Sequence, residues 1–86
     1  MTVDAHSTEK LTIGQPGMYE LTFETSSTHG RIFLKQGSRI QMLNQNSLVL
    51  EGQYAYILKV TDATAEVVIQ NIGDEVIDNV IIKEAN

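Results

Sequence analysis

The stretch Gly17–Thr25, GMYELTFET, decides the fold of this chain. It follows a Pro-Gly turn, and its apolar side chains Tyr19, Leu21 and Phe23 alternate with Glu and Thr. Alternation with a period of two is typical of a half-buried antiparallel strand. Such a strand has one apolar face and two edges of unpaired backbone groups, so the rest of the chain must supply neighbouring strands and a second layer.

The remaining sequence offers more strands of this kind and no clear helix. Alternating or wholly apolar segments cover residues 9–13, 31–35, 39–43, 47–50, 54–61, 65–71 and 76–83. About eight short strands separated by turn residues are typical of a β-sandwich or small barrel. The sequence therefore predicts an all-β fold, an antiparallel β-sandwich, with one domain over residues 9–86 and a flexible or docking arm over residues 1–8.

One face of each predicted strand supplies the core. The side chains expected to point inward are Leu11, Ile13, Tyr19, Leu21, Phe23, Leu34, Ile40, Leu58, Val60, Val67, Ile69 and Val80. Residues 36–38 are typical of the loop of a tight hairpin, so Ile32 and Met42 can also point inward, together with Leu34 and Ile40.

Composition limits the partners. The 86 residues carry six basic and eleven acidic side chains, a net charge of -5, which repels phosphate backbones and anionic lipid. The N-terminus lacks the pattern of a signal peptide, and the longest apolar run, residues 54–58, is too short to span a membrane. We expect neither a nucleic-acid nor a membrane partner. Without cysteine for a disulfide, a small all-β chain often relies on a second subunit, so we expect a homo-oligomer.

Four residues are predicted to form an interface or a ligand platform. Phe33 falls on the opposite face from the core residues of its strand, and Val68 does the same in a later strand. Tyr54 and Tyr56 belong to a segment that is apolar on both faces, as expected in the middle of a sheet or at an interface.

The chain contains no recognisable catalytic motif. Ser27 and His29 share a polar loop, but a nucleophile needs a base that is held by a third group on rigid structure. We therefore expect no enzyme and no cofactor, with one exception. Asp74, Glu75 and Asp78 concentrate the oxygen ligands that Ca²⁺ prefers, so they are candidates for a structural calcium site, and an ordinary exposed turn is the alternative.

Two motifs carry a family resemblance. The run LTIGQPGMYELTFET resembles the opening of small jelly-roll modules, in which a PG-x-Y-x-L-x-F strand follows a short first strand. This opening is similar to that of noncatalytic carbohydrate-binding modules and of trimeric, tumour-necrosis-factor-like knobs on viral and spore surfaces. The closing DEVIDNVIIKEAN resembles the last strand of the carbohydrate-binding modules, whose acid joins a calcium site; that acid is Asp78 here. The resemblance implies a jelly roll, and the knobs imply a trimer.

The first functional hypothesis is a structural or decoration protein of a phage-like particle. A jelly roll without an export signal or a catalytic domain is ordinary for a virion component, which assembles in the host cytoplasm and ends on the virion surface. Its partners would be its own copies and a capsid or tail protein, with residues 1–10 docking on the particle. The alternative is a carbohydrate-binding module or receptor-binding knob, which would be extracellular and would bind a saccharide.

Overall fold

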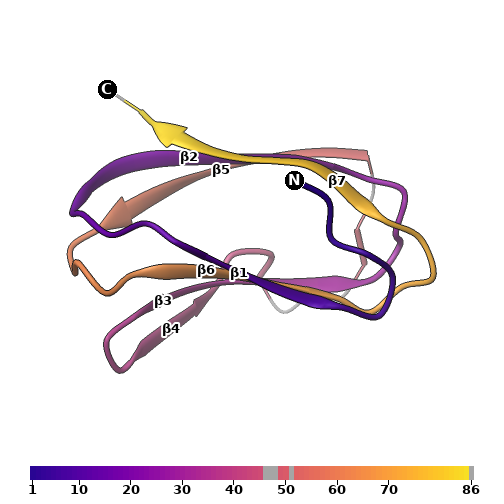
Figure 1. Cartoon of the computed structure of the whole chain (residues 1–86), viewed down its shortest axis with the longest axis horizontal. Coiled ribbons are helices and arrows are strands. Elements are labelled where there is room, and N and C mark those ends of the chain that lie inside the picture. Colours follow the sequence, from indigo (N-terminus) through magenta and orange to yellow (C-terminus); the bar gives the residue numbers. More distant parts are fainter. Residues whose placement is uncertain (46–48, 51, 86) are drawn as a thin grey trace.

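All regular structure is β-strand in the computed structural model, which describes residues 1–45, 49, 50 and 52–85 (Figure 1). The seven strands in this part of the chain are β1 (Thr8–Thr12), β2 (Gly17–Thr25), β3 (Gly30–Gln36), β4 (Arg39–Met42), β5 (Gly52–Val60), β6 (Glu66–Asn71) and β7 (Ile77–Glu84). The predicted all-β fold is confirmed. The strand predicted at residues 47–50 falls partly outside the described residues; in its described part, Val49 forms an isolated bridge with His29.

The strands form two antiparallel sheets that pack as two layers (Figure 1). One sheet has the order β1-β6-β3-β4, and the other has the order β5-β2-β7. The strand β2 is central in the second sheet, where alternation buries Tyr19, Leu21 and Phe23 against the first sheet. The predicted antiparallel sandwich is therefore confirmed, while the jelly-roll relationship stays a prediction.

The core contains the side chains predicted for it except Ile40 and Met42, with Leu11 and Ile13 partly buried at its margin. It contains Ile32, as the hairpin predicted, and also apolar residues that were not in the predicted set: Val3, Leu50, Ala65 and Ile77.

The prediction for Ile40 is wrong because the hairpin loop is one residue shorter than expected. Strands β3 and β4 are joined by two residues, so Lys35 pairs with Ile40 and Leu34 pairs with Gln41. A change of one residue in register moves every side chain of a strand to the other face. Ile40 is accordingly 64% exposed on the outer face of the four-stranded sheet, and Met42 pairs with Phe33 on that same face.

A β-bulge interrupts the alternation of the last strand, β7. Alternation places Ile77 and Val80 on opposite faces, yet both are buried. The register between β2 and β7 shifts between Thr22 and Glu24, and Asn79 adopts a left-handed φ of 51°. An extra residue at this point re-aims the side chains that follow it, so Ile77 and Val80 both reach the core.

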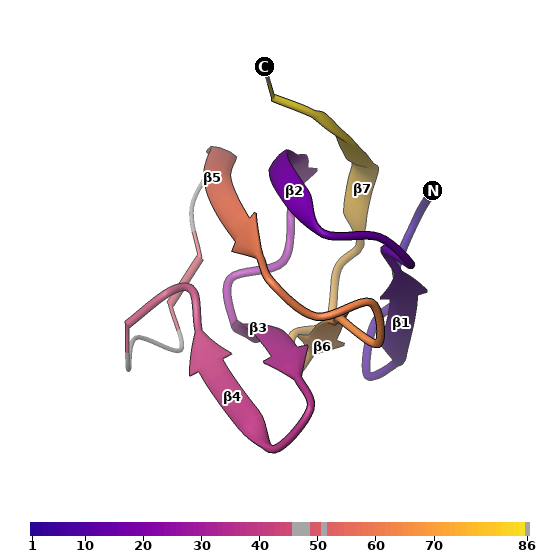
Figure 2. The same cartoon turned by 90° about the vertical axis from the view of Figure 1, so that its left-hand side faces the viewer.

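The N-terminal segment closes one side of the sandwich (Figure 2). Val3 is fully buried and exchanges two backbone hydrogen bonds with Ile77, at 2.7 and 3.0 Å, and the amide of Val80 donates to the carbonyl of Met1. The chain then crosses to the other sheet, where β1 pairs with β6. Residues 1–3 of the predicted arm thus lie along the edge of β7. The opposite side of the sandwich is bordered by β4 and β5 (Figure 2).

Candidate functional site

The outer face of the four-stranded sheet brings two of the four predicted interface residues together. Phe33 and Val68 are direct partners across β3 and β6. With Lys10, Lys35 and Ile40 they line a shallow groove of about 310 Å³. Phe33 is half-buried and Val68 is buried, so Ile40 is the most exposed apolar side chain of the group.

Basic side chains surround this apolar groove. Lys10 pairs with Val68, while Arg31 and Lys35 flank Phe33 on the same face of β3. The acid Glu66 lies 3.6 Å from the Lys35 ammonium. This surface carries more basic than acidic groups on a chain whose net charge is -5. We call the surface formed by Lys10, Arg31, Phe33, Lys35, Ile40 and Val68 the Phe33 face.

Tyr54 and Tyr56 lie elsewhere, on β5 in the other sheet. They pair with Phe23 and Leu21 of β2 and therefore face the inner side of the sandwich. The Tyr54 ring stacks on Phe23 with centroids 5.2 Å apart and on Tyr56 at 5.9 Å. Partial burial, and secondarily the neighbouring Tyr54, raise the pKa of the Tyr56 hydroxyl. The four predicted platform residues therefore form two separate groups.

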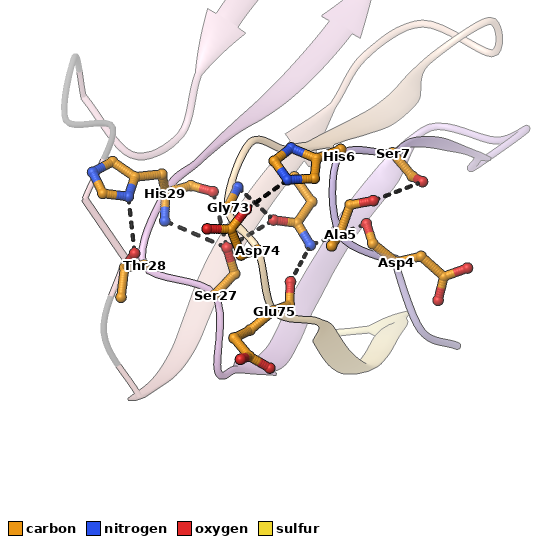
Figure 3. Close-up of polar contacts among 11 residues, drawn as sticks. Asp4, Ala5, His6, Ser7, Ser27, Thr28, His29, Gly73, Asp74 and Glu75 are labelled. Carbon is orange, nitrogen blue, oxygen red and sulfur yellow. Dashed lines mark hydrogen bonds and ion pairs between the residues drawn. The ribbon is translucent and has the colours of Figure 1, made fainter.

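Among the described residues, the buried polar side chains are Ser27 and Asn71, which belong to one cluster. Figure 3 shows Ser27, Gly73 and Glu75, which surround the Asn71 side chain. Its side-chain NH₂ donates to the carbonyls of Val3, Asp4 and Glu75 at 3.2, 3.1 and 2.7 Å. Its Oδ1 accepts the Ser27 hydroxyl at 2.7 Å and the Gly73 amide at 3.1 Å. One side chain thus joins the N-terminal segment, the loop after β2 and the turn after β6.

Sequence reasoning missed this cluster, although one signal was available. Asn71 continues the alternation of Val67 and Ile69, which predicts an inward side chain at the end of β6. A buried amide of this kind must find hydrogen-bond partners. The partners that it finds are distant in sequence: Val3 is 68 positions away and Ser27 is 44.

The Ser and His residues of the predicted loop do not form a nucleophile and base pair. The buried Ser27 hydroxyl faces the Asn71 Oδ1 and the His29 main-chain carbonyl, at 2.7 and 3.1 Å. The His29 ring contacts the Thr28 hydroxyl instead. The contacts of Ser27 hold a loop in place and do not activate its oxygen.

The three predicted calcium ligands make separate contacts. Asp74 lies 2.7 Å from the ring of His6, and Asp78 accepts the Thr2 hydroxyl at 2.6 Å. Glu75 contributes its main-chain carbonyl to Asn71. Within the described part of the chain, no three acidic or histidine side chains converge on a point where a metal could bind.

The lowered pKa values of two exposed carboxylates indicate that the free energy of unfolding decreases in acid. The Thr2 hydroxyl and then the Asn79 amide lower the pKa of Asp78, and the Thr64 hydroxyl and amide lower that of Asp62. Both pKa values fall below their ordinary 3.8, so the unfolded chain binds more protons near that pH. The contribution of these carboxylates is complete above the unfolded value and is lost as the pH falls through the folded values.

We therefore expect the melting temperature to decline below about pH 4 as such carboxylates are protonated, and to decline less steeply in the Asp78→Asn variant. Thermal melts between pH 7 and 2.5 measure this, and Asp62→Asn should flatten the pH profile in the same way, because Thr64 lowers the pKa of Asp62. A pH profile of Asp78→Asn that parallels the wild type would contradict the role assigned to Thr2 and Asn79.

Comparisons with family models, with curated protein sequences and with solved structures found no match. The described residues contain no helix of the length and apolarity that a membrane crossing requires. Fold and surface together define an all-β sandwich with an apolar, basic-rimmed outer face.

Proposed function

We propose that the protein is a non-enzymatic structural protein that decorates a virus-like (phage) particle, docking through the Phe33 face. The observation that carries this proposal is the apolar groove around Phe33 on a surface richer in bases than the rest of an acidic chain. Exposed apolar surface with a polar rim is characteristic of protein–protein contacts. The matching surface on the particle would be apolar at its centre and acidic around it.

We assign docking to the Phe33 face and not to the N-terminal segment. Residues 1–10 were expected to anchor the protein, but Val3 is buried and residues 1–3 pair with β7. A segment engaged in this way must leave the sandwich before it can bind elsewhere. The Phe33 face requires no such rearrangement, because Ile40 is already 64% exposed.

We expect an Ile40→Glu variant to lose its place on the particle while remaining folded. The substitution adds a charge at the centre of the apolar contact, and an unpaired charge buried in an interface is costly. Cells that express the chain with its genomic neighbours are lysed, particles are separated on a density gradient, and the chain is detected by antibody in the particle fraction.

The matched control is Ile81→Glu, because Ile81 is 53% exposed on β7 in the other sheet. Its co-sedimentation should equal that of the wild type. A wild-type chain that stays at the top of the gradient contradicts the proposed function, and equal incorporation of the two variants contradicts the role of the Phe33 face.

The alternative, saccharide binding, has one observation in its favour. A groove of about 620 Å³ on the other sheet includes Thr22, Glu24, Gln53 and Asn79 in its lining. The two oxygens of Glu24 accept the amides of Gln53 and Asn79 at 3.0 and 2.8 Å. Amides and carboxylates are suited to sugar hydroxyls. Oligosaccharide binding that survives Ile40→Glu and is lost in Glu24→Gln would favour this alternative.

A further inference from the structure

The strand β5 has one edge without a neighbouring strand. It lies at the end of the sheet β5-β2-β7 and pairs with β2 on one side alone. On the other side, Gln36 caps its C-terminal end: the Gln36 amide donates to the Lys59 carbonyl at 3.2 Å and accepts the Thr61 amide at 2.7 Å. The backbone groups of Lys59 therefore point away from β2.

The same must hold for Ala55 and Ile57, because backbone direction in an antiparallel strand alternates with a period of two. Their N–H and C=O groups point out of the sheet. Among the described residues, no group accepts from or donates to the backbone of Ala55 or Ile57 on this edge.

This edge also lacks the features that normally prevent pairing. Exposed edge strands are usually short, charged, bulged or interrupted by proline. Residues 52–58 read GQYAYIL, without a charge or a proline, and Ile57 is 59% exposed. By contrast, residues 1–3 cover part of the edge of β7, and β4 is only four residues long.

We infer that β5 pairs antiparallel with β5 of a second copy of this chain, around a two-fold axis at Tyr56. The two three-stranded sheets then form one continuous six-stranded sheet. An antiparallel pair of identical strands is self-complementary, as a closed two-fold contact requires. Ala55 of each copy faces Ile57 of the other and exchanges backbone hydrogen bonds with it.

Side-chain size and charge favour this register. The large exposed Ile57 lies opposite the small exposed Ala55 of the second copy, so the two fit on the outer face. Lys59 lies opposite Gln53 of the second copy. Gln53 is the direct neighbour of Glu24 and donates to its carboxylate at 3.0 Å, so each lysine approaches an acid of the other chain.

The pairing would also bring together the half-buried tyrosines of the two copies. With Leu43, Asn44, Gln45 and Val49 of the same chain, Tyr54 and Tyr56 line a shallow pocket of about 300 Å³ on the side of the sandwich bordered by β4 and β5. In the pair, Tyr56 meets its own counterpart at the axis and Tyr54 lies opposite Leu58 of the second copy. The inference stands on the β5 edge alone and leaves the Phe33 face free for docking. A two-fold pair also differs from the trimer that the sequence resemblance implies.

Sedimentation equilibrium of the purified chain tests the inference. We expect a species of twice 9.5 kDa at tens of micromolar, and an Ile57→Lys variant whose dimer dissociates at least about tenfold more readily, because the variant places two lysines beside the axis. The matched control is Ile81→Lys, since Ile81 is 53% exposed on the outer face of the same sheet but not on the β5 edge. Thermal melts confirm that both variants fold.

Amide hydrogen exchange identifies the edge. The amides of Ala55 and Ile57 should be protected in the wild-type dimer and should exchange rapidly on dilution or in Ile57→Lys. A monomer at 100 μM, a trimer, or a dimer in which these two amides exchange rapidly overturns the inference. Equal weakening by Ile57→Lys and Ile81→Lys overturns it as well. None of these results depends on whether the protein docks on a particle.

Discussion

An Asn71→Asp variant is expected to lose about 3–5 kcal/mol of its free energy of unfolding at pH 7, the usual cost of an uncompensated buried charge. The side chain is 2% exposed, and the substitution keeps its size and shape. Its NH₂ group, which donates to three main-chain carbonyls, becomes a second carboxylate oxygen. Three attractive contacts become repulsive, and a charge is transferred into the interior.

The deficit of the variant should become smaller as the pH falls, whereas the wild-type protein itself loses stability in acid. Protonation removes the buried charge and restores one donor, so the deficit relative to wild type should shrink as the pH approaches 4. Urea denaturation at pH 7 and at pH 4.5 measures both quantities. Residues 1–4 should be released first, because Asn71 holds the carbonyls of Val3 and Asp4, and limited proteolysis detects that release.

The matched control is Asn44→Asp. Asn44 is only partly buried; its side-chain NH₂ donates to the Gly30 carbonyl at 3.0 Å, and its Oδ1 accepts the Ile32 amide at 3.3 Å. We expect a smaller loss, about 1–2 kcal/mol, because the new carboxylate is only partly buried while the Gly30 carbonyl loses its donor. Equal losses in the two variants, or a deficit of Asn71→Asp that is unchanged by pH, would contradict the central role given to Asn71.

Local patterns predicted most of the fold because burial in a sandwich follows strand alternation. The period of two in β2 was enough to place Tyr19, Leu21 and Phe23 in the core, and their burial confirms it. The same reasoning was wrong for Ile40, where the face depends on a single residue of loop length. Strict alternation would also place Ile77 on the face opposite Val80, but a bulge shifts the register and both are buried. In both strands the face on which a side chain lies depends on the exact pairing register, which composition does not determine.

The candidate surfaces were predictable only in part. The outward face of Phe33 and Val68 followed from alternation, and the structure makes them direct partners. Tyr54 and Tyr56 were chosen because their segment is apolar on both faces, but that pattern does not distinguish a central strand from a bare edge. Only the strand order identifies β5 as an edge. The Asn71 cluster joins residues up to 68 positions apart and was beyond any local pattern.

Phe23→Ala is expected to cost about 3–5 kcal/mol, the usual range for truncating a buried aromatic residue. Phe23 is 2% exposed and lies on β2, the central strand of its sheet. The centroid of its ring lies 5.2 Å from that of Tyr54, on which it stacks, and 6.2 Å from that of Tyr56. Truncation removes the buried area, leaves a cavity between the sheets and frees both tyrosine rings. Small domains are stable by only about 5–15 kcal/mol, so most of the variant's stability should be lost.

The chain provides its own control, because its second phenylalanine lies on the outer face. Phe33 is half-buried on β3 and faces away from the core, so Phe33→Ala should cost clearly less in the isolated protein. Thermal melts compare the two variants at one protein concentration, because self-association would otherwise shift the transition. A Phe23→Ala variant that melts within a few degrees of wild type, or no lower than Phe33→Ala, would show that the Phe23 ring does not hold the two sheets together.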